Sequence, residues 1–138
     1  MRAMHCFAGT LIALAACGDD TTDPIAPDAA APRERIVETK MLIGSEIAEA
    51  TLEGGPGDRA QIQLASTTAN LDWNIHGHAG GSSQTIVEEI QVMSAAHDFQ
   101  PPADAAWSLL LRNHSAIESL ELTVTIDLYG DMQWRGWE

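Results

Sequence analysis

The feature that most constrains the fold is a strict alternation of side chains over residues 119–129. Apolar side chains occupy every second position, and the positions between them are polar or charged. The apolar set is Leu120, Leu122, Val124, Ile126 and Leu128. A period of two over this length predicts a β-strand with one face buried and the other in solvent. A strand of this kind needs a second layer of structure against its apolar face.

Several shorter runs of the same type precede this one and are separated by turn signals. The predicted strands cover residues 35–43, 47–52, 60–65, 71–78, 85–93 and 107–112. The turn signals are the Gly/Pro-rich residues 54–58, the Gly/Ser-rich residues 79–83, the prolines of 100–102 and residues 113–115. Short strands at this spacing predict an all-β domain over residues 33–138, a single jelly-roll-like β-sandwich of about seven to eight strands.

Two segments leave alternatives open. Residues 83–96 place Ile86, Ile90 and Met93 at helical spacing, whereas a strand would put Ile86, Glu88, Ile90 and Val92 on one face. We favour the strand, and an α+β fold is the rival prediction. Residues 130–138 carry Trp134 and Trp137, and burial of large apolar rings favours packing against the sandwich over a frayed tail.

The first sixteen residues have the composition of a secretory signal peptide. Arg2 supplies positive charge, residues 7–14 supply a short apolar stretch, and small residues follow up to Ala16. This stretch is too short for a transmembrane helix. We therefore expect residues 1–16 to be removed during export.

The sequence Leu14-Ala15-Ala16-Cys17 resembles the lipobox of bacterial lipoproteins. The resemblance implies cleavage between Ala16 and Cys17, a diacylglyceryl thioether on Cys17 and acylation of its amino group with a fatty acid such as palmitate. Two or more acyl chains hold a protein stably in a membrane. Gly18 stands where an inner-membrane retention signal of this family has aspartate, so the outer membrane is favoured, with the domain facing the periplasm or the cell exterior.

Residues 17–32 form the predicted linker between the anchor and the domain. The segment after Cys17 is rich in Asp, Pro and Ala and has one large aliphatic residue, Ile25, so it cannot bury enough surface to offset the entropy of ordering. The two cysteines of the chain are Cys6 and Cys17. Because Cys6 lies in the predicted signal and Cys17 carries the predicted lipid, we expect no disulfide-linked partner.

The charge balance excludes one class of partner. Seven lysines and arginines against twenty acidic residues give 7 − 20 = −13. Such a polyanion has no basic patch to neutralise phosphates, so nucleic acid is not an expected partner.

One local run carries candidate metal ligands. In a strand over residues 71–78, Asp72, Asn74, His76 and His78 share the face opposite the apolar side chains. Two histidines at this spacing lie about 7 Å apart at Cα, and neutral imidazoles suit Zn²⁺ or Cu²⁺. The third ligand is open between His97, His114, Asp98 and Asp72.

Motifs of catalysis are missing from the sequence. It has no G-x-S-x-G, P-loop, G-x-G-x-x-G or H-E-x-x-H pattern. We therefore expect a non-catalytic binding or structural module without a cofactor, with an envelope protein as its partner. The alternative is a metal-binding envelope module that uses His76 and His78.

A second resemblance covers residues 71–128. Residues 71–78, the Pro-containing turn of 99–104, the Trp-led run of 107–113 and the final alternating strand are similar to GOLD/emp24-type and pre-peptidase C-terminal-type β-sandwiches. The resemblance implies a jelly-roll-like sandwich used for binding or stabilisation. The disulfide and the membrane helix of the eukaryotic family are missing, so only the fold is carried over.

Overall fold

The computed structural model describes residues 31–138, which form nine β-strands and one short 3₁₀ turn. The strands are β1 (Glu34–Leu42), β2 (Ile47–Gly54), β3 (Arg59–Ser66), β4 (Leu71–Gly77), β5 (Gln84–Val92), β6 (Ser94–Phe99), β7 (Ala105–Asn113), β8 (Leu120–Tyr129) and β9 (Gln133–Trp137), with the 3₁₀ turn at Ala79–Gly81. None of the described residues forms a helix long and apolar enough to cross a membrane.

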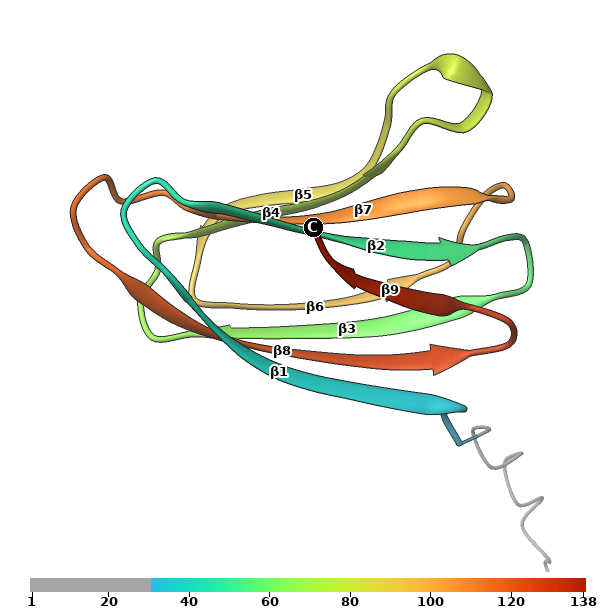
Figure 1. The fold of residues 1–138 in the computed structure, drawn as a ribbon, viewed down its shortest axis with the longest axis horizontal. Helices are drawn as coiled ribbons and strands as arrows, with labels where there is room; N and C mark the ends of the chain where they lie inside the picture. The colour runs from blue at the N-terminus through green and yellow to red at the C-terminus, as the bar shows by residue number, and fades with distance from the viewer. Residues whose placement is uncertain (1–30) are drawn as a thin grey trace, which may run out of the picture.

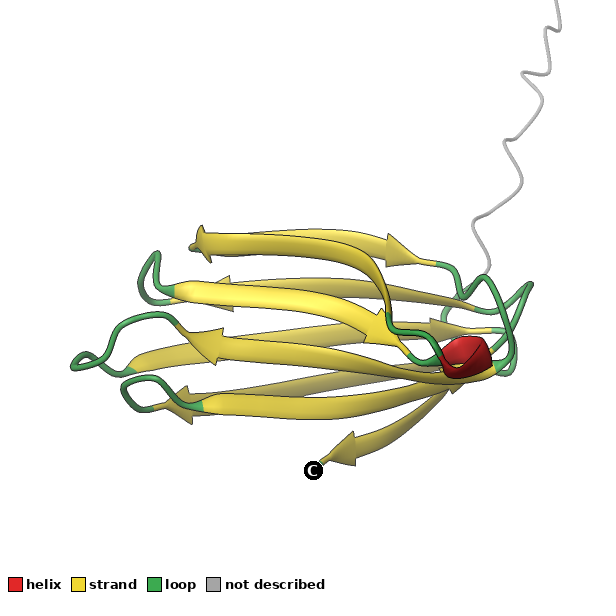
Figure 2. Cartoon of the chain, turned by 90° about the horizontal axis from the view of Figure 1, so that it is seen from above, coloured by secondary structure: helices red, strands yellow, loops and turns green. Residues whose placement is uncertain are grey.

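The strands form two antiparallel sheets that face each other (Figures 1 and 2). One sheet has the order β1-β8-β3-β6 and the other has the order β5-β4-β7-β2-β9. The first eight strands pair as a nested hairpin, β1 with β8, β2 with β7, β3 with β6 and β4 with β5. A long hairpin rolled into two sheets is a jelly roll, so the predicted all-β sandwich is confirmed.

Antiparallel pairing sorts the connections onto two ends of the sandwich. We call the end at which the described chain enters the proximal end, because Arg33 donates from its backbone to Leu128 and from its side chain to Gly130. The connections 55–58, 78–83, 100–104 and 130–132 also lie there. The opposite, distal end holds the connections 43–46, 67–70 and 114–119 and Met93 between β5 and β6 (Figure 1).

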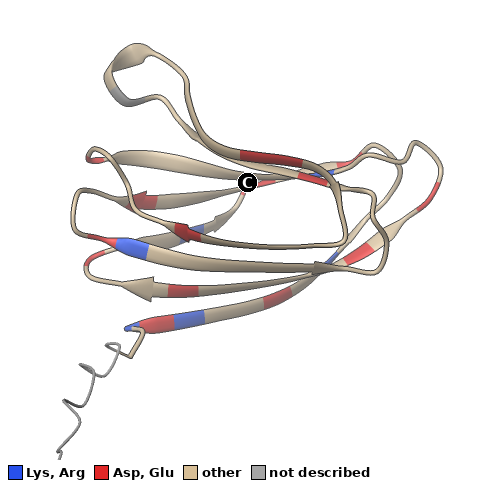
Figure 3. Cartoon of the chain, turned by 180° about the vertical axis from the view of Figure 1, so that it is seen from behind, with Lys and Arg blue, Asp and Glu red and all other residues tan. Residues whose placement is uncertain are grey.

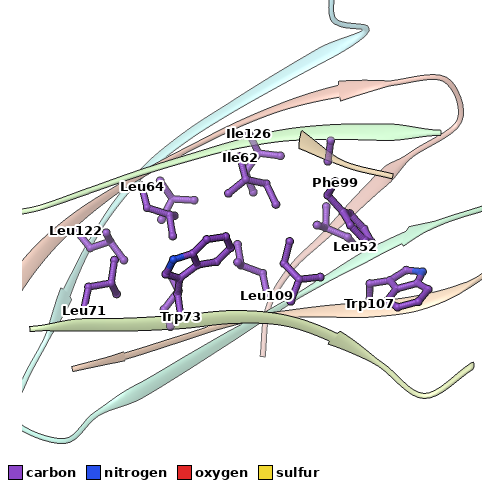
Figure 4. Packing of buried hydrophobic residues seen from close by; sticks show 14 of the residues in the cluster. Leu52, Ile62, Leu64, Leu71, Trp73, Phe99, Trp107, Leu109, Leu122 and Ile126 are labelled. Atoms are coloured by element: carbon purple, nitrogen blue, oxygen red, sulfur yellow. The ribbon is translucent and has the colours of Figure 1, made fainter. Parts of the chain in front are cut away.

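The core lies between the sheets and is filled by alternate side chains of both (Figure 4). Trp73, Trp107 and Phe99 are its largest members, each 1% exposed or less. The buried indole N–H of Trp73 donates to Glu89 Oε2 at 3.0 Å, which satisfies the polar atom that burial of tryptophan brings into a core. Among residues 31–138, the members of the core and the apolar side chains packed on it lie between Ile36 and Trp137.

All seven predicted strands are present, and the structure adds two. β6 was not predicted because it follows β5 after one residue, Met93, without a turn signal, and its small and polar side chains suit an edge strand. β9 was not predicted because Gly136 has a positive φ of 94° and the register with β2 shifts at Thr51 and Leu52. Trp134 and Trp137 nevertheless pack against the core as expected.

The helical alternative for residues 83–96 is wrong, and so is the simple strand alternation expected there. β5 pairs with β4 through two register shifts, and Gln91 at the second has a positive φ of 54°. Ile86 and Val87 are therefore both half-buried, whereas Ile90 is exposed. A β-bulge moves the following residues to the other face, which a period-two pattern cannot reveal.

β1 shows an inverted pattern. Its residues Glu38 and Lys40 pair with inward-facing Val124 and Leu122, and both meet Trp137 of β9. The Trp137 indole donates to Glu38, and Lys40 Nζ lies 4.2 Å from the ring centroid. β9 thus covers the polar inner side of an edge strand, while Val37 and Met41 of β1 face solvent.

A close approach of β4 to β7 generates the first testable prediction. Gly77 lies opposite Trp107, and a Cβ at Gly77 would come within 2.5 Å of Trp107 Cε3. We expect Gly77→Ala to lower the free energy of unfolding by about 1–3 kcal/mol, because overpacking forces the ring or the strand to move.

The double variant Gly77→Ala/Trp107→Phe is the control. Phenylalanine lacks the outer ring atoms that cause the clash and the indole N–H, which has no acceptor among the described residues. Urea unfolding should show a cost for the pair below the sum of the two single costs. Additive costs would contradict a direct clash.

The edge strand β1 is fastened to β8 by a bidentate ion pair, which generates a second prediction. Arg35 donates to both carboxylate oxygens of the buried Asp127, at 2.6 and 2.7 Å, and this lowers the pKa of Asp127 below its ordinary value. A depressed native pKa stabilises the fold above the unfolded-state pKa of about 3.9, and the stabilisation is lost as the pH falls through the native pKa.

We therefore expect Asp127→Asn to lower the melting temperature at pH 7 and to flatten its decline below about pH 4. Thermal unfolding followed by circular dichroism between pH 7 and 2 measures both effects. Asp131→Asn removes an exposed carboxylate from the proximal end and should leave the acid dependence close to that of the unchanged chain. Parallel acid dependences for Asp127→Asn and the unchanged chain would contradict the assignment.

Candidate binding surface

The predicted modification site lies outside the described residues. Cys17 and Ala16, together with the predicted signal and most of the linker, belong to residues 1–30. The structure describes the chain from Ala31 and places its entry at the proximal end.

The two candidate metal ligands lie close together at the proximal side of β4. His76 is on the outer face of β4, as predicted, but β4 ends at Gly77 and His78 begins the connection to β5. Their ring centroids are 5.7 Å apart in an edge-to-face arrangement. His76 Nδ1 lies 2.8 Å from Asn74 Oδ1, and His76 Nε2 lies 3.8 Å from Glu49 Oε1 on β2. Glu49 was not among the predicted ligands.

The predicted third ligands do not join this pair. His97 points inward, with its ring centroid 6.1 Å from that of Trp73, whereas Asp98 pairs with Arg59 on the outer face of the other sheet. His114 and Asp72 bond to each other at 2.9 Å near the distal end. Within residues 31–138 no group of three or more His, Cys, Asp or Glu side chains is arranged to hold a metal ion.

The metal hypothesis predicts a specific calorimetric result. Titration of Zn²⁺ or Cu²⁺ into the purified chain should release heat that His76→Ala/His78→Ala abolishes, because two imidazoles supply the ligands. His114→Ala is the matched control, since this imidazole is bonded to Asp72 and should leave the heat unchanged. Equal heats for the unchanged chain and the double variant would remove the hypothesis.

Asn113, which the sequence indicated only as part of a turn, is a buried residue that joins two connections of the distal end. Asn113 is fully buried, and its amide donates to the carbonyl oxygens of Leu42, Ile43 and Glu118 at 3.0, 3.2 and 2.6 Å. Its own Oδ1 accepts from the backbone of Ser115. One side chain therefore joins the β1–β2 connection to the β7–β8 connection.

The two connections also touch directly. The backbone N–H of Ser45 donates to the Ser115 carbonyl at 2.7 Å, and a Cβ at Gly44 would meet the Ala116 carbonyl at 2.2 Å. The Ser115 hydroxyl accepts from the backbone of Ile117 and Glu118. These contacts hold the connections 43–46 and 114–119 against each other.

Exposed apolar side chains gather at the distal end. Among residues 31–138, seven large hydrophobic residues are mostly in solvent. Six of them lie at this end, namely Met41, Ile43, Ile47, Ile90, Met93 and Ile117, and the seventh is Val37. Ile117 is 91% exposed. Single exposed apolar residues need no explanation, but their collection at one end marks an interaction surface.

Carboxylates surround these apolar side chains. Glu46 and Glu118 lie in the two joined connections, and Glu121 is the second residue of β8. Figure 3 shows acidic segments along this end. On the neighbouring outer face of the sheet, a hollow of about 160 Å³ is lined by Asp72, Trp73, Asn74, Glu88, Glu89, Ile90, Leu110 and Arg112. Its charged lining is therefore mostly acidic.

The proximal end differs in its use of carboxylates. Asp58 accepts hydrogen bonds from the backbone of Gly55 and Asp131, and these bonds lower the pKa of Asp58 below its ordinary value. The Asp58 carboxylate thereby joins the β2–β3 turn to the β8–β9 turn. A hollow of about 340 Å³ lies beside these turns and is lined by Glu53, Asp58, Asp104 and Asp131 among others. Of these carboxylates, Asp58 closes turns and Glu53 pairs with Arg135.

Comparisons with solved structures support the fold. Aeromonas hydrophila PliG, a periplasmic inhibitor of g-type lysozyme, superposes with a TM-score of 0.54 at 14% identity over 69% of this chain and 86% of its own length. The Yersinia pseudotuberculosis-derived mitogen also has a TM-score of 0.54 at 14% identity, over 78% of this chain and 95% of its own. No family model and no curated protein matches the sequence.

These likenesses define the class of the chain as a small β-sandwich domain and go no further. At 14% identity they show a shared fold, and the two neighbours have different activities in their names. These likenesses do not test the resemblance to GOLD/emp24-type or pre-peptidase C-terminal-type domains, which stays a prediction, as does the lipobox. The partner has to be inferred from this chain's own surface.

Proposed function

We propose that this protein is a lipid-anchored component of the bacterial cell envelope whose β-sandwich is a non-catalytic module that binds another protein. Cys17 carries the lipid, and residues 18–32 connect it to the domain. Gly18 favours the outer membrane. The domain then acts as a tethered receptor in the periplasm or at the cell exterior.

The observation that carries this proposal is the separation of the two ends. Arg33 enters at the proximal end, and the exposed apolar side chains lie at the distal end. Fifteen linker residues at about 3 Å each can span up to about 45 Å. An anchor at Cys17 therefore attaches the domain by the end opposite the apolar side chains and leaves the apolar end accessible to a partner.

The fold neighbours agree with a binding role without chemistry. The Aeromonas protein is by its name an inhibitor, which acts by binding another protein. A g-type lysozyme is accordingly one partner to test against this chain. The mitogen with the same TM-score shows that the fold alone does not select this partner.

Metal binding is the second candidate function. It is favoured by the approach of Glu49 Oε1 to within 3.8 Å of His76 Nε2, beside the His78 ring. In this version His76 and His78 hold Zn²⁺ or Cu²⁺, and Glu49 approaches from β2.

Anchoring has a direct test in cells. The unchanged chain should incorporate labelled palmitate and sediment with membranes, whereas Cys17→Ser should lose the label and leave the membrane fraction, because the thioether requires the sulfur. Cys6→Ser is the control and should keep both properties, since Cys6 precedes the cleavage site. Label or membrane retention in Cys17→Ser would contradict the proposal.

A further inference from the structure

We infer that the distal end binds a basic protein segment that carries apolar side chains. This inference rests on the proposed protein-binding function and adds the chemistry of the partner and the residues that meet it. The surface consists of Ile43 and Ile117 with the carboxylates of Glu46, Glu118 and Glu121 around them.

The apolar part of the surface is fixed before a partner arrives. Ile43 and Ile117 are 62% and 91% exposed, and they lie on connections that Asn113 joins by hydrogen bonds. A partner that covers them gains hydrophobic burial and has little loop entropy to remove. Binding to these hydrogen-bonded connections therefore costs less conformational entropy than binding to a loop that becomes ordered only in the complex.

The negative charge around these side chains favours a partner with positive charge. Glu46 Oε2 accepts from the backbone of Ile43, and Glu118 Oε2 accepts from the Asn70 amide. Within residues 31–138 no lysine or arginine forms an ion pair with Glu46, Glu118 or Glu121. These carboxylates remain available to attract lysine and arginine of a partner and to steer its approach.

The hollow on the adjacent sheet face offers a place for one such cation. Asp72, Glu88 and Glu89 line it against the single guanidinium of Arg112, and Ile90 and Leu110 supply apolar walls. This lining suits the aliphatic stem and charged head of a lysine or arginine. The residues that line the hollow lie toward the distal ends of β4, β5 and β7, at the end that also carries Ile43 and Ile117.

The same charges disfavour two other occupants. A second copy of the chain would bring identical carboxylates together, and like charges repel. An anionic lipid surface would meet the same repulsion, although exposed isoleucines can insert into lipid. Both are outcomes that the experiment distinguishes.

The test uses the chain from Gly18 to Glu138, which contains every described residue of the core, and three sets of fluorescent 15-residue peptides. The sets combine Lys/Arg with Ile/Leu, Lys/Arg with Ser, and Glu with Ile/Leu. We expect the first set to bind at least about tenfold more tightly than the others. Ile43→Ser/Ile117→Ser should weaken this binding about tenfold or more, the size expected from losing buried aliphatic side chains.

The control for the apolar change is Val37→Ser, because Val37 is 61% exposed but lies in the middle of β1, away from the distal end. Glu118→Gln/Glu121→Gln should weaken binding and reduce its dependence on salt, whereas Asp131→Asn at the proximal end should do neither. Circular dichroism checks that each variant keeps the fold, which substitution of exposed side chains permits.

Several results would overturn the inference. These are equal binding of the peptide sets, no binding by any of them, or affinity unaffected by the distal changes. Ile117-dependent binding to phosphatidylcholine vesicles with or without phosphatidylglycerol would assign the surface to lipid, and Ile117-dependent dimers in sedimentation would assign it to a second copy. Peptide binding lost in Gln63→Arg, on the outer face of the other sheet, would overturn the distal site and leave the proposed binding function standing. Failure of palmitate labelling would contradict the proposed lipid anchor and leave the inferred binding surface unaffected.

Discussion

The whole structure depends on closing two antiparallel sheets over one apolar core with no disulfide among the described residues. Each strand contributes every second side chain to this core, and Trp73, Phe99 and Trp107 fill its widest parts. The buried indole N–H of Trp73 donates a hydrogen bond to the carboxylate of Glu89 on the neighbouring strand, so burial leaves this polar group satisfied. Because the core uses one face of each sheet, the outer faces and the connections are free to vary in chemistry.

The nested order of the strands converts that core into a molecule with two different ends. Connections that follow odd-numbered strands lie at one end and those that follow even-numbered strands lie at the other. At the proximal end, the Asp58 carboxylate joins two turns. The distal end fixes its backbone through Asn113 and leaves isoleucine side chains and carboxylates to solvent. The proposed attachment and the proposed recognition surface thereby lie at opposite ends of one core.

Much of this architecture follows from the sequence, because strands buried on one face leave a period-two signature. The run over residues 119–129 corresponds to β8, and the Gly/Pro-rich residues 54–58 form a turn as predicted. The signature disappears where an edge strand is short and polar, as in β6, and where bulges interrupt the alternation, as in β5.

The candidate surface was harder to predict because it depends on contacts between distant connections. Asn113 bonds to residues about seventy positions away, and nothing in its local sequence distinguishes it from an ordinary turn asparagine. The one available signal is Ile117, a lone large apolar residue in the polar connection 114–119. His76 and His78 are near each other as spacing suggested, whereas the approach of Glu49 from another strand required the sheet order.

The position of β1 has a mechanical consequence. A lipid would pull on the domain at the start of β1, and a partner held at the distal end would pull in the opposite direction along the same axis. β1 and β8 are joined by nine residue pairs from Glu34↔Leu128 to Leu42↔Leu120, and the hydrogen bonds of an antiparallel pair lie perpendicular to the strands. Tension between the proposed anchor and a bound partner would therefore load these bonds together in shear instead of opening them one after another. An edge strand such as β1 is the easiest element of a sheet to peel away. A force along the strand axis would not peel β1 from β8.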